Sequence, residues 1–399
     1  MNRPLSSGCR LAVVATVPET LRAFMRLHLE AMATAYSTTA ICGGKSTSRF
    51  EGLPQSVQFR YVPIERKISL FRDVFALWKL IALFRQERYT VVHSITPKAG
   101  LLAMCAAFVC RVPFRVHVFT GQVWATRKGG ARYFLKIFDE LIAMLATHVL
   151  ADSASQRRFL IDQGVVDPRQ IAVLGDGSIC GVDTMRFKPE PDVRKKQRLA
   201  LELPDGAVVA LFLGRLTRDK GVVDLANAFS TCVPRHTNLY LLIVGPDEED
   251  LIPLLSKIVL LCADRVRFVS MTNCPENYMA AADFLCLPSY REGFGSVIIE
   301  AGASGIPAIA SRIYGLTDAV EEGVTGLLHR PGDVEDIEQK IDLMVTSREM
   351  RLAMGERARK RAKDLFSSSR IVADQMAFYE KILSSVESVD VQNATSDRE

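Results

Sequence analysis

The sequence predicts an α/β protein with two domains, each built on its own parallel β-sheet. Its 399 residues are enough for two domains with separate hydrophobic cores. A short apolar strand, a loop and an amphipathic helix follow one another at 10–32, and a second such series starts with the apolar run at 208–213. Repeated units of this kind form parallel sheets, whose ligands gather at the carboxyl ends of the strands.

The composition indicates an ordinary globular protein of a reducing compartment. Hydrophobic residues make up 48% and charged residues 24% of the chain. The nine cysteines include no C-x-x-C pair and the histidines are not clustered, which favours free thiols over disulfides or a zinc site. Residues 1–11 lack the apolar core of a signal peptide, and the longest uncharged apolar run, 99–110, is too short to span a bilayer. We therefore expect a cytoplasmic protein without an integral membrane segment.

Charge is unevenly distributed between the two halves of the chain. Residues 1–190 hold 25 Lys and Arg against 14 Asp and Glu, a difference of +11, whereas 191–399 hold 25 against 31, a difference of −6, which together give the net charge of +5. A basic first half predicts a surface that meets anions, either phospholipid or polyprenyl phosphate. The chain has no zinc finger, RNP-like aromatic motif or basic heptad helix, so nucleic acid is not an expected partner.

A glycine-containing turn between a strand and a helix is the most informative stretch. The apolar run 284–287 predicts a buried strand that leads into the turn. Gly293 and Gly295 bracket Phe294, so the backbone can turn tightly and approach a ligand closely. Ser296 is placed to cap the following helix, and the N–H groups at such a helix start attract a phosphate group.

Two glutamates flank this turn in a way that suits a sugar nucleotide. Glu292 lies in the loop and Glu300 in the helix, so one carboxylate can sit beside phosphates while the other reaches hydroxyls further along the same ligand. The pair resembles the E-x7-E element of the retaining GT-B glycosyltransferases of family 4, which use nucleotide-sugar donors. Other motifs of that family occur in the same order over roughly 170–380, namely Gly214-Arg215-Leu216 with Lys220-Gly221, Val244-Gly245-Pro246, Ala281-Ala282-Asp283, Gly302-x-x-Gly305-Ile306-Pro307 and Gly326-Leu327-Leu328.

The resemblance implies two Rossmann-like domains that face each other across a cleft. It places the acceptor-side domain at 1–190 and the nucleotide-sugar-binding domain at 191–370, with the boundary in the proline-containing, charged stretch 189–196. A helix at 371–385 should cross back to the first domain. The polar tail 386–399 is expected to be disordered.

The donor site is predicted at the carboxyl edge of the second sheet. Arg215 and Lys220 follow the strand at 208–213 in a segment that is neither a dinucleotide fingerprint nor a P-loop. Arginine can grip a diphosphate through two donors and lysine adds a compact positive charge, with structural ion pairing as the alternative. The resemblance implies that Glu292 contacts the donor sugar or its diphosphate, so the expected catalytic residues are Arg215, Lys220 and Glu292. The expected donor-binding residues are Gly214, Gly293, Phe294, Gly295, Ser296 and, at the ribose, Glu300.

The implied reaction moves a sugar from a nucleoside diphosphate to an acceptor hydroxyl with retained configuration. No nucleophile stands out, so we expect a dissociative, same-face route in which a donor phosphate oxygen takes the acceptor proton. No Asp-x-Asp pair occurs, and neither a metal nor a cofactor is expected. The segments 96–100, 119–124 and 288–295 look most like bacterial enzymes that build capsule, exopolysaccharide or O-antigen repeat units. Their acceptors are undecaprenyl-diphosphate sugars at the inner face of the cytoplasmic membrane, and a UDP-activated hexose or N-acetylhexosamine is the expected donor.

Acceptor contacts are expected at the carboxyl edge of the first sheet. Thr16, in the loop after the first strand, either contacts the acceptor or belongs to an ordinary connection. Lys98 lies at the start of a helix, where a phosphate-binding site would use it. Relatives commonly carry His-Gly where this chain has Thr120 and Gly121, and His117, three positions earlier, is either a functional substitute or a hydrogen-bonded core residue.

The helix at 68–84 carries a broad apolar face bordered by basic residues. Such a face usually packs on a sheet. The alternative is that part of it rests on an anionic membrane.

Two other functional classes share this architecture. A non-hydrolysing sugar-nucleotide epimerase would turn over the donor without any acceptor. A non-catalytic binding or assembly subunit would not need the site residues, and the presence together of Arg215, Lys220, Glu292 and Glu300 argues against it.

Overall fold

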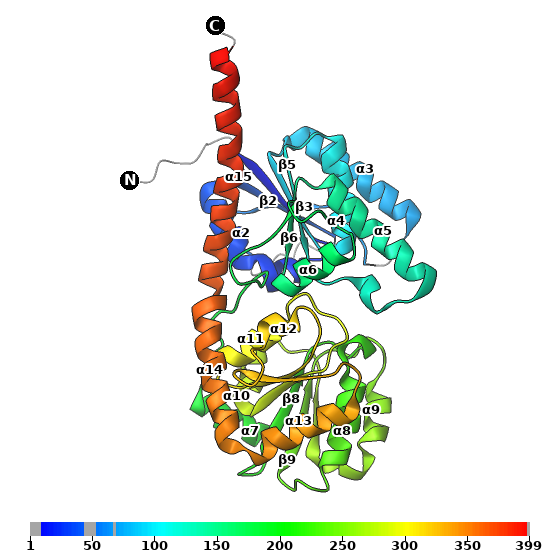
Figure 1. Cartoon of the computed structure of the whole chain (residues 1–399), viewed down its shortest axis with the longest axis vertical. Coiled ribbons are helices and arrows are strands. Elements are labelled where there is room, and N and C mark those ends of the chain that lie inside the picture. The colour runs from blue at the N-terminus through cyan, green and yellow to red at the C-terminus, as the bar shows by residue number, and fades with distance from the viewer. Residues whose placement is uncertain (1–8, 44–52, 67–68, 397–399) are drawn as a thin grey trace. The chain divides into compact units, whose positions relative to one another are not determined.

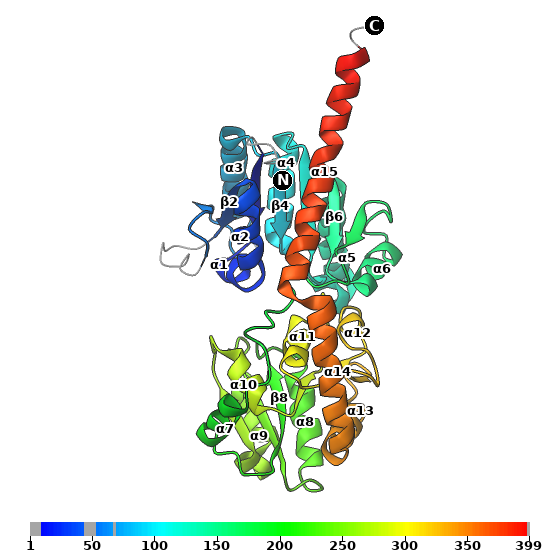
Figure 2. The same cartoon turned by 90° about the vertical axis from the view of Figure 1, so that its left-hand side faces the viewer.

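The chain folds into two compact units (Figure 1, Figure 2). The structure, a computed structural model, describes residues 9–43, 53–66 and 69–396. The two units comprise Met1–Cys180 with Ser369–Glu399, and Gly181–Ser368.

The second unit begins at Gly181, ten residues before the domain boundary expected between 190 and 191. The reason is the short segment after Gly181, whose Val182 and Phe187 are buried in the core of the second unit. The Val182 N–H also donates to the Phe366 carbonyl over 2.7 Å, which fixes this segment to the last helix of that unit.

A seven-stranded parallel sheet forms the centre of the first unit, in the order β3-β2-β1-β4-β5-β6-β7. Its strands are β1 (Arg10–Val14), β2 (Ser37–Cys42), β3 (Gln58–Tyr61), β4 (Val91–Ile95), β5 (Phe114–Phe119), β6 (His148–Ala151) and β7 (Ile171–Val173). The central strand β1 is buried after its first residue because helices cover both faces of the sheet, and this explains its continuous apolar run. The strand order reverses between β1 and β4, the kind of point beside which open α/β sheets bind ligands.

Helices cover both faces of this first sheet. They are α1 (Pro18–Thr20), a π-helical segment (Leu21–Met25), α2 (Arg26–Ala35), α3 (Leu70–Glu87), α4 (Pro97–Val109), a 3-10 turn (Val123–Thr126), α5 (Gly129–Leu145), α6 (Ala154–Asp162) and α15 (Ser368–Ser396). Helices α3, α4 and α5 contribute to the core on one face, whereas α2 and α15 contribute to the core on the other (Figure 1).

The broad apolar face of helix α3 was expected to pack on a sheet, but only part of it is buried. Its buried residues are Ala76, Leu80 and Phe84, which form a narrow stripe toward the core. The larger apolar residues between 70 and 78 are exposed instead. In the described parts of the chain, no helix is long and apolar enough to cross a membrane.

The C-terminal helix α15 belongs to the first unit, as expected for a helix that returns there. Its Tyr379 is fully buried, and the hydroxyl of this residue hydrogen-bonds the Nδ1 atom of His93 in β4. The helix continues to Ser396, where disorder was predicted from 386. The segment from 368 to 396 contains no glycine or proline, so its polar composition alone does not end the helix. Residues 397–399 of the predicted tail lie outside the described residues.

The second unit is built on a six-stranded parallel sheet in the order β10-β9-β8-β11-β12-β13. Its strands are β8 (Val208–Leu213), β9 (Leu239–Val244), β10 (Val266–Val269), β11 (Phe284–Leu287), β12 (Ala308–Ser311) and β13 (Gly326–His329). Its helices are α7 (Pro191–Ala200), α8 (Val222–Cys232), α9 (Ile252–Ile258), α10 (Pro275–Ala281), α11 (Ser296–Ala303), α12 (Leu316–Ala319), α13 (Val334–Thr346) and α14 (Arg348–Phe366), with 3-10 turns at Arg218–Lys220 and Leu260–Arg265. The strand order reverses between β8 and β11, so the loops after these two strands meet at the switch point of the sheet.

Candidate active site

The loops after β8 and β11 approach each other through a glycine. Gly221 has a left-handed backbone (φ +68°), and a Cβ atom added there would lie 2.0 Å from the carbonyl oxygen of Pro288. Only glycine allows this approach without movement of the backbone. The contact brings Lys220, the residue before this glycine, to the loop that carries Glu292.

Lys220 and Glu292 form a partly buried ion pair. The Lys220 ammonium contacts the Oε1 atom of Glu292, and the two side chains are 20% and 14% exposed. Ser289, which is fully buried, donates from its Oγ atom to the same oxygen over 2.8 Å. The Glu292 carboxylate is therefore fixed by a lysine 72 positions earlier and by a serine three positions earlier.

A second set of contacts holds the Glu292 loop over the 3-10 turn. The backbone N–H of Tyr290 donates to the Asp219 carbonyl over 2.8 Å, and the Arg291 guanidinium pairs with the Asp219 carboxylate at 3.0 Å. The Tyr290 hydroxyl donates to Asp224 in α8 over 2.7 Å. The loop is thus tied to the segment after β8 by both its backbone and its side chains.

Arg215 lies at the same edge of the sheet but has a different partner. Its guanidinium pairs with the Glu248 carboxylate at 2.7 Å, and the two side chains are 48% and 35% exposed. Glu248 follows β9, the neighbour of β8 on the side away from β11. Both cations are therefore ion-paired within the second unit, Lys220 to a site glutamate and Arg215 to a residue of the acidic loop after β9.

The start of α11 differs in one detail from the expected cap. The helix begins at Ser296, and Gly295 occupies the capping position with φ +82°. Ser296 is therefore the first helical residue and not the cap, because the left-handed glycine lets the chain enter the helix one residue earlier. Phe294 is buried against Phe366, which leaves its backbone to shape the turn.

Glu300, in the second turn of α11, has an unusual ionisation. Burial raises the pKa of its carboxyl to about 7, while nearby Arg186 acts to lower the pKa and Glu276 acts to raise it. Arg186 itself pairs with Glu276 at 2.8 Å and donates to the Asn273 carbonyl over 2.7 Å. Among the residues the structure describes, none hydrogen-bonds the carboxyl oxygens of Glu300. This carboxyl can therefore accept hydrogen bonds from ligand hydroxyls.

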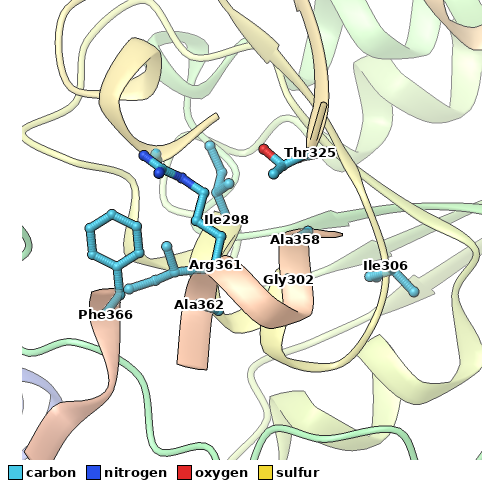
Figure 3. Close-up of a pocket in the computed structure, with 11 residues that line it drawn as sticks. Ile298, Gly302, Ile306, Thr325, Ala358, Arg361, Ala362 and Phe366 are labelled. Carbon is cyan, nitrogen blue, oxygen red and sulfur yellow. The ribbon is translucent and has the colours of Figure 1, made fainter. Parts of the chain in front are cut away.

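Helix α11 is held in place by α14, as Figure 3 shows. A Cβ atom on Gly302 would lie 3.1 Å from the Ala358 carbonyl, so the two helices are in close contact there. Arg361 stacks over the ring of Phe366 and donates to the Asp318 carbonyl over 2.9 Å. The small pocket lined by residues of α11 and α14 has mostly apolar walls, so we assign it no ligand.

The acceptor-side candidates follow adjacent strands of the first sheet. The Oγ1 atoms of Thr16, after β1, and Thr96, after β4, are 2.7 Å apart. Lys98 pairs with Asp73 of α3 at 2.6 Å. Thr120 and Gly121 follow β5, and Gly121 has φ 112°.

His117 does not share this edge, because its side chain is buried within the sheet. Its Nδ1 atom hydrogen-bonds the Ser94 hydroxyl at 2.8 Å, and the ring fills the space beside Gly100. Burial lowers the pKa of the imidazole to about 3. The structure therefore gives His117 the position of the hydrogen-bonded core residue that the sequence left as an alternative.

The sequence did not single out several residues of this arrangement, among them Ser289, Glu248 and Arg186. Ser289 lies between the strand at 284–287 and Glu292, and this position at the strand end was a sequence signal that it could contact the glutamate. Glu248 and Arg186 gave none, because their partners are distant in sequence and are brought close only by the tertiary packing. In the part of the chain that the structure describes, no group of three or more His, Cys, Asp or Glu is placed to hold a metal ion.

Known proteins match the chain over most of its length. A family model described as glycosyl transferases group 1 matches residues 193–361, and one described as glycosyl transferase 4-like domain matches residues 20–177. The capsular polysaccharide biosynthesis glycosyltransferase CapM of Staphylococcus aureus is 31% identical over 81% of this chain and 84% of its own length. An Escherichia coli UDP-Gal:alpha-D-GlcNAc-diphosphoundecaprenol alpha-1,3-galactosyltransferase is 28% identical over 71% of this chain and 73% of its own length.

The fold is likewise shared with a solved structure. Anabaena Alr3699/HepE, solved in complex with UDP and glucose, superposes with a TM-score of 0.77 at 22% identity and covers 94% of this chain and 99% of its own. With two parallel-sheet units and with family models that together span both of them, the chain belongs to the family 4 glycosyltransferases of the GT-B fold.

Proposed function

We propose that this glycosyltransferase moves a hexose or N-acetylhexosamine from a UDP-sugar to a hydroxyl of a polyprenyl-diphosphate-linked saccharide, with retained anomeric configuration. The step belongs to the synthesis of a bacterial surface polysaccharide. The observation that carries the proposal is the Lys220–Glu292 pair at the switch point of the second sheet, next to the start of α11. The acceptor class is supported by the diphosphoundecaprenol named for the Escherichia coli relative, and the UDP donor by the UDP complex of the Anabaena protein.

The donor diphosphate is held by the two cations and the helix start. Lys220 and Arg215 supply positive charge, and the first-turn N–H groups of α11 point toward the same edge of the sheet. Negative charge grows on the departing diphosphate as the glycosidic bond breaks, and fixed positive groups stabilise that charge without reorganisation. Glu292, held by Ser289 and Lys220, accepts hydrogen bonds from hydroxyls of the donor sugar, and Glu300 accepts them from the ribose.

Transfer with retention follows from a same-face displacement. The bond from the anomeric carbon to the phosphate oxygen breaks, and the acceptor oxygen bonds to the carbon on the same face. The acceptor proton passes to the departing phosphate oxygen, which serves as the base. This route requires neither a protein nucleophile nor a metal ion, and activity should persist in EDTA.

The reaction takes place at the inner face of the cytoplasmic membrane. A polyprenyl chain keeps the acceptor in the bilayer, so the enzyme meets it as a peripheral protein on an anionic surface. The basic charge of residues 1–190 supports this placement.

The test is a transfer assay with purified protein, a panel of nucleotide sugars and a short-chain lipid-diphosphate saccharide. Retention is read by NMR of the new glycosidic linkage, and loss of Lys220 by Lys220→Ala should reduce turnover by about 10²–10³-fold. Lys257→Ala serves as the control, because Lys257 is a basic residue of α9 that makes no ion pair in the described chain. Donor turnover in the absence of any acceptor would instead identify an epimerase, and failure of every nucleotide sugar to bind would identify a non-catalytic subunit.

A further inference from the structure

Large apolar side chains are exposed on the outer side of α3. Leu70, Phe71, Val74, Phe75 and Trp78 are between 50% and 92% exposed. They lie within two and a half turns of the helix, and three of them follow one another at intervals of four residues. We call these five side chains the outer α3 face. Contiguous exposed apolar side chains of this size mark an interaction surface.

Helix α5 adds two aromatic side chains at the same edge of the unit. Tyr133 and Phe134, in its first turns, are 70% and 58% exposed. Helices α3 and α5 both pack against α4, and the three lie together on one side of the first sheet (Figure 1). Helices that connect parallel strands all run opposite to the strands, so the N-terminal halves of α3, α4 and α5 lie at the carboxyl edge of the sheet. This edge also carries Thr16 and Lys98.

Positive charge borders the apolar side chains. Arg127 and Lys128 are exposed in the loop before α5, and Lys79 follows Trp78 on α3. None of these three cations forms an ion pair with any residue that the structure describes. Lys79 instead lies over the ring of Phe75, with its Nζ atom 4.9 Å from the ring centroid.

We propose that the outer α3 face, with Tyr133 and Phe134, is the surface by which this protein lies on a bilayer of anionic phospholipid. The apolar side chains project from helices and are exposed, which suits insertion between lipid headgroups. The unpaired cations beside them match the negative charge of those headgroups. A two-fold contact with a second copy would bring this basic border close to itself, which is unfavourable.

The proposal deepens the proposed function, on which it rests for the position of the acceptor. A lipid-diphosphate saccharide in that bilayer has its diphosphate at the headgroup level. When the outer α3 face rests on the bilayer, the carboxyl edge of the first sheet, which carries Thr16 and Lys98, lies near the lipid headgroups and thus near the acceptor diphosphate. The surface therefore delivers the acceptor to the acceptor-side candidates.

Vesicle binding measures the surface directly and needs no substrate. The probes are vesicles of phosphatidylglycerol with phosphatidylcholine, and vesicles of phosphatidylcholine alone. The chain has two tryptophans, of which Trp78 is 63% exposed and Trp124 is buried and donates to Asp139 over 2.8 Å. We expect Trp78 fluorescence to shift to the blue with anionic vesicles and to be quenched by brominated lipid chains. In Trp78→Phe, the fluorescence change should disappear while cosedimentation persists.

Substitutions on this surface should weaken binding without unfolding the protein. We expect Phe71→Ser and Phe75→Ser each to reduce vesicle partitioning by roughly tenfold, because each removes one inserted aromatic side chain. The matched control is Leu261→Ser, since Leu261 is a fully exposed apolar residue of the second unit. Higher salt should weaken the binding of wild type to anionic vesicles. The proposal is overturned if wild type does not bind anionic vesicles, or if Phe71→Ser and Leu261→Ser bind equally well.

Two further readouts separate this proposal from the others. A dimer of wild type that becomes monomeric in Phe71→Ser, without loss of vesicle binding, would assign the surface to a second copy and overturn the lipid proposal. Activity on a water-soluble acceptor should be unchanged in Phe71→Ser. Loss of vesicle binding in that variant with retained soluble activity supports the surface, whereas absence of transfer by wild type with intact vesicle binding refutes only the proposed reaction.

Discussion

Removal of the Ser289 hydroxyl tests whether a fixed Glu292 carboxylate is needed for turnover. Ser289→Ala removes the 2.8 Å hydrogen bond to the Oε1 atom of Glu292 and leaves the Lys220 contact in place. A hydrogen bond to a charged group contributes about 1.5–3 kcal/mol. Since about 1.4 kcal/mol corresponds to a tenfold change in rate, we expect kcat/KM for the donor to fall roughly 10- to 100-fold. The free energy of unfolding should fall by no more than about 2 kcal/mol, because Glu292 keeps one partner.

The measurement is the initial rate of transfer as a function of donor concentration, with urea unfolding of the same preparations. The control is Ser311→Ala, because Ser311 in β12 is also fully buried and its hydroxyl lies 3.4 Å from His329, outside the candidate site. We expect the control to keep the wild-type rate. Equal kcat/KM in both variants would refute the role assigned to Ser289. If Ser289→Ala is unfolded, the prediction that its free energy of unfolding falls only slightly is wrong.

Three further substitutions probe the backbone, the ionisation and the competition within the site. Gly221→Ala should lower the free energy of unfolding by more than Gly206→Ala in urea titrations, because both have positive φ but only the first places a Cβ against backbone; equal losses would contradict the close approach. The raised pKa of Glu300 means that its carboxyl binds a proton more tightly in the folded protein than in the unfolded chain, so the free energy of unfolding should fall as pH rises from about 4.5 to about 7. In Glu300→Gln, the free energy of unfolding measured with urea should depend less on pH over this range. An unchanged pH dependence would contradict the raised pKa. Glu248→Gln should lower the Kd for UDP by about two- to fivefold in calorimetry, because Arg215 then has no carboxylate partner that competes with the diphosphate. The control Glu249→Gln should leave this Kd unchanged, because Glu249 accepts from the backbone of Arg218 and does not pair with Arg215. Weaker UDP binding by Glu248→Gln would contradict the competition between Glu248 and the diphosphate for Arg215.

Much of the fold was predictable because it depends on local patterns. Apolar runs such as 208–213 and 284–287 matched the strands to within a residue, since a strand buried on both faces needs a continuous apolar segment. The end of α15 was not predictable from composition, because a polar segment without glycine or proline can continue a helix. The spacing of Arg215, Lys220 and Glu292 relative to strand ends placed all three at one edge, and the strand order confirms that edge.

The partners within the site depended on tertiary structure. Lys220 pairs with Glu292 and Arg215 with Glu248 because β8 lies between β11 and β9, and this strand order leaves no mark on the local sequence. The same holds for His117, which the sequence left as either a functional substitute or a hydrogen-bonded core residue and whose ring is buried beside Gly100 of α4.

The sequence by itself determined the α/β class, the two units and the residue types at the strand ends, because each follows from the order of residues along a short stretch of chain. Only the tertiary structure decided which charges are paired and which apolar side chains remain outside the core. Phe71 and Phe84 both lie on α3, and only the packing of this helix on α4 and the sheet leaves the first exposed and buries the second. Such choices depend on which segments, distant in sequence, come into contact, and spacing along the chain does not specify them.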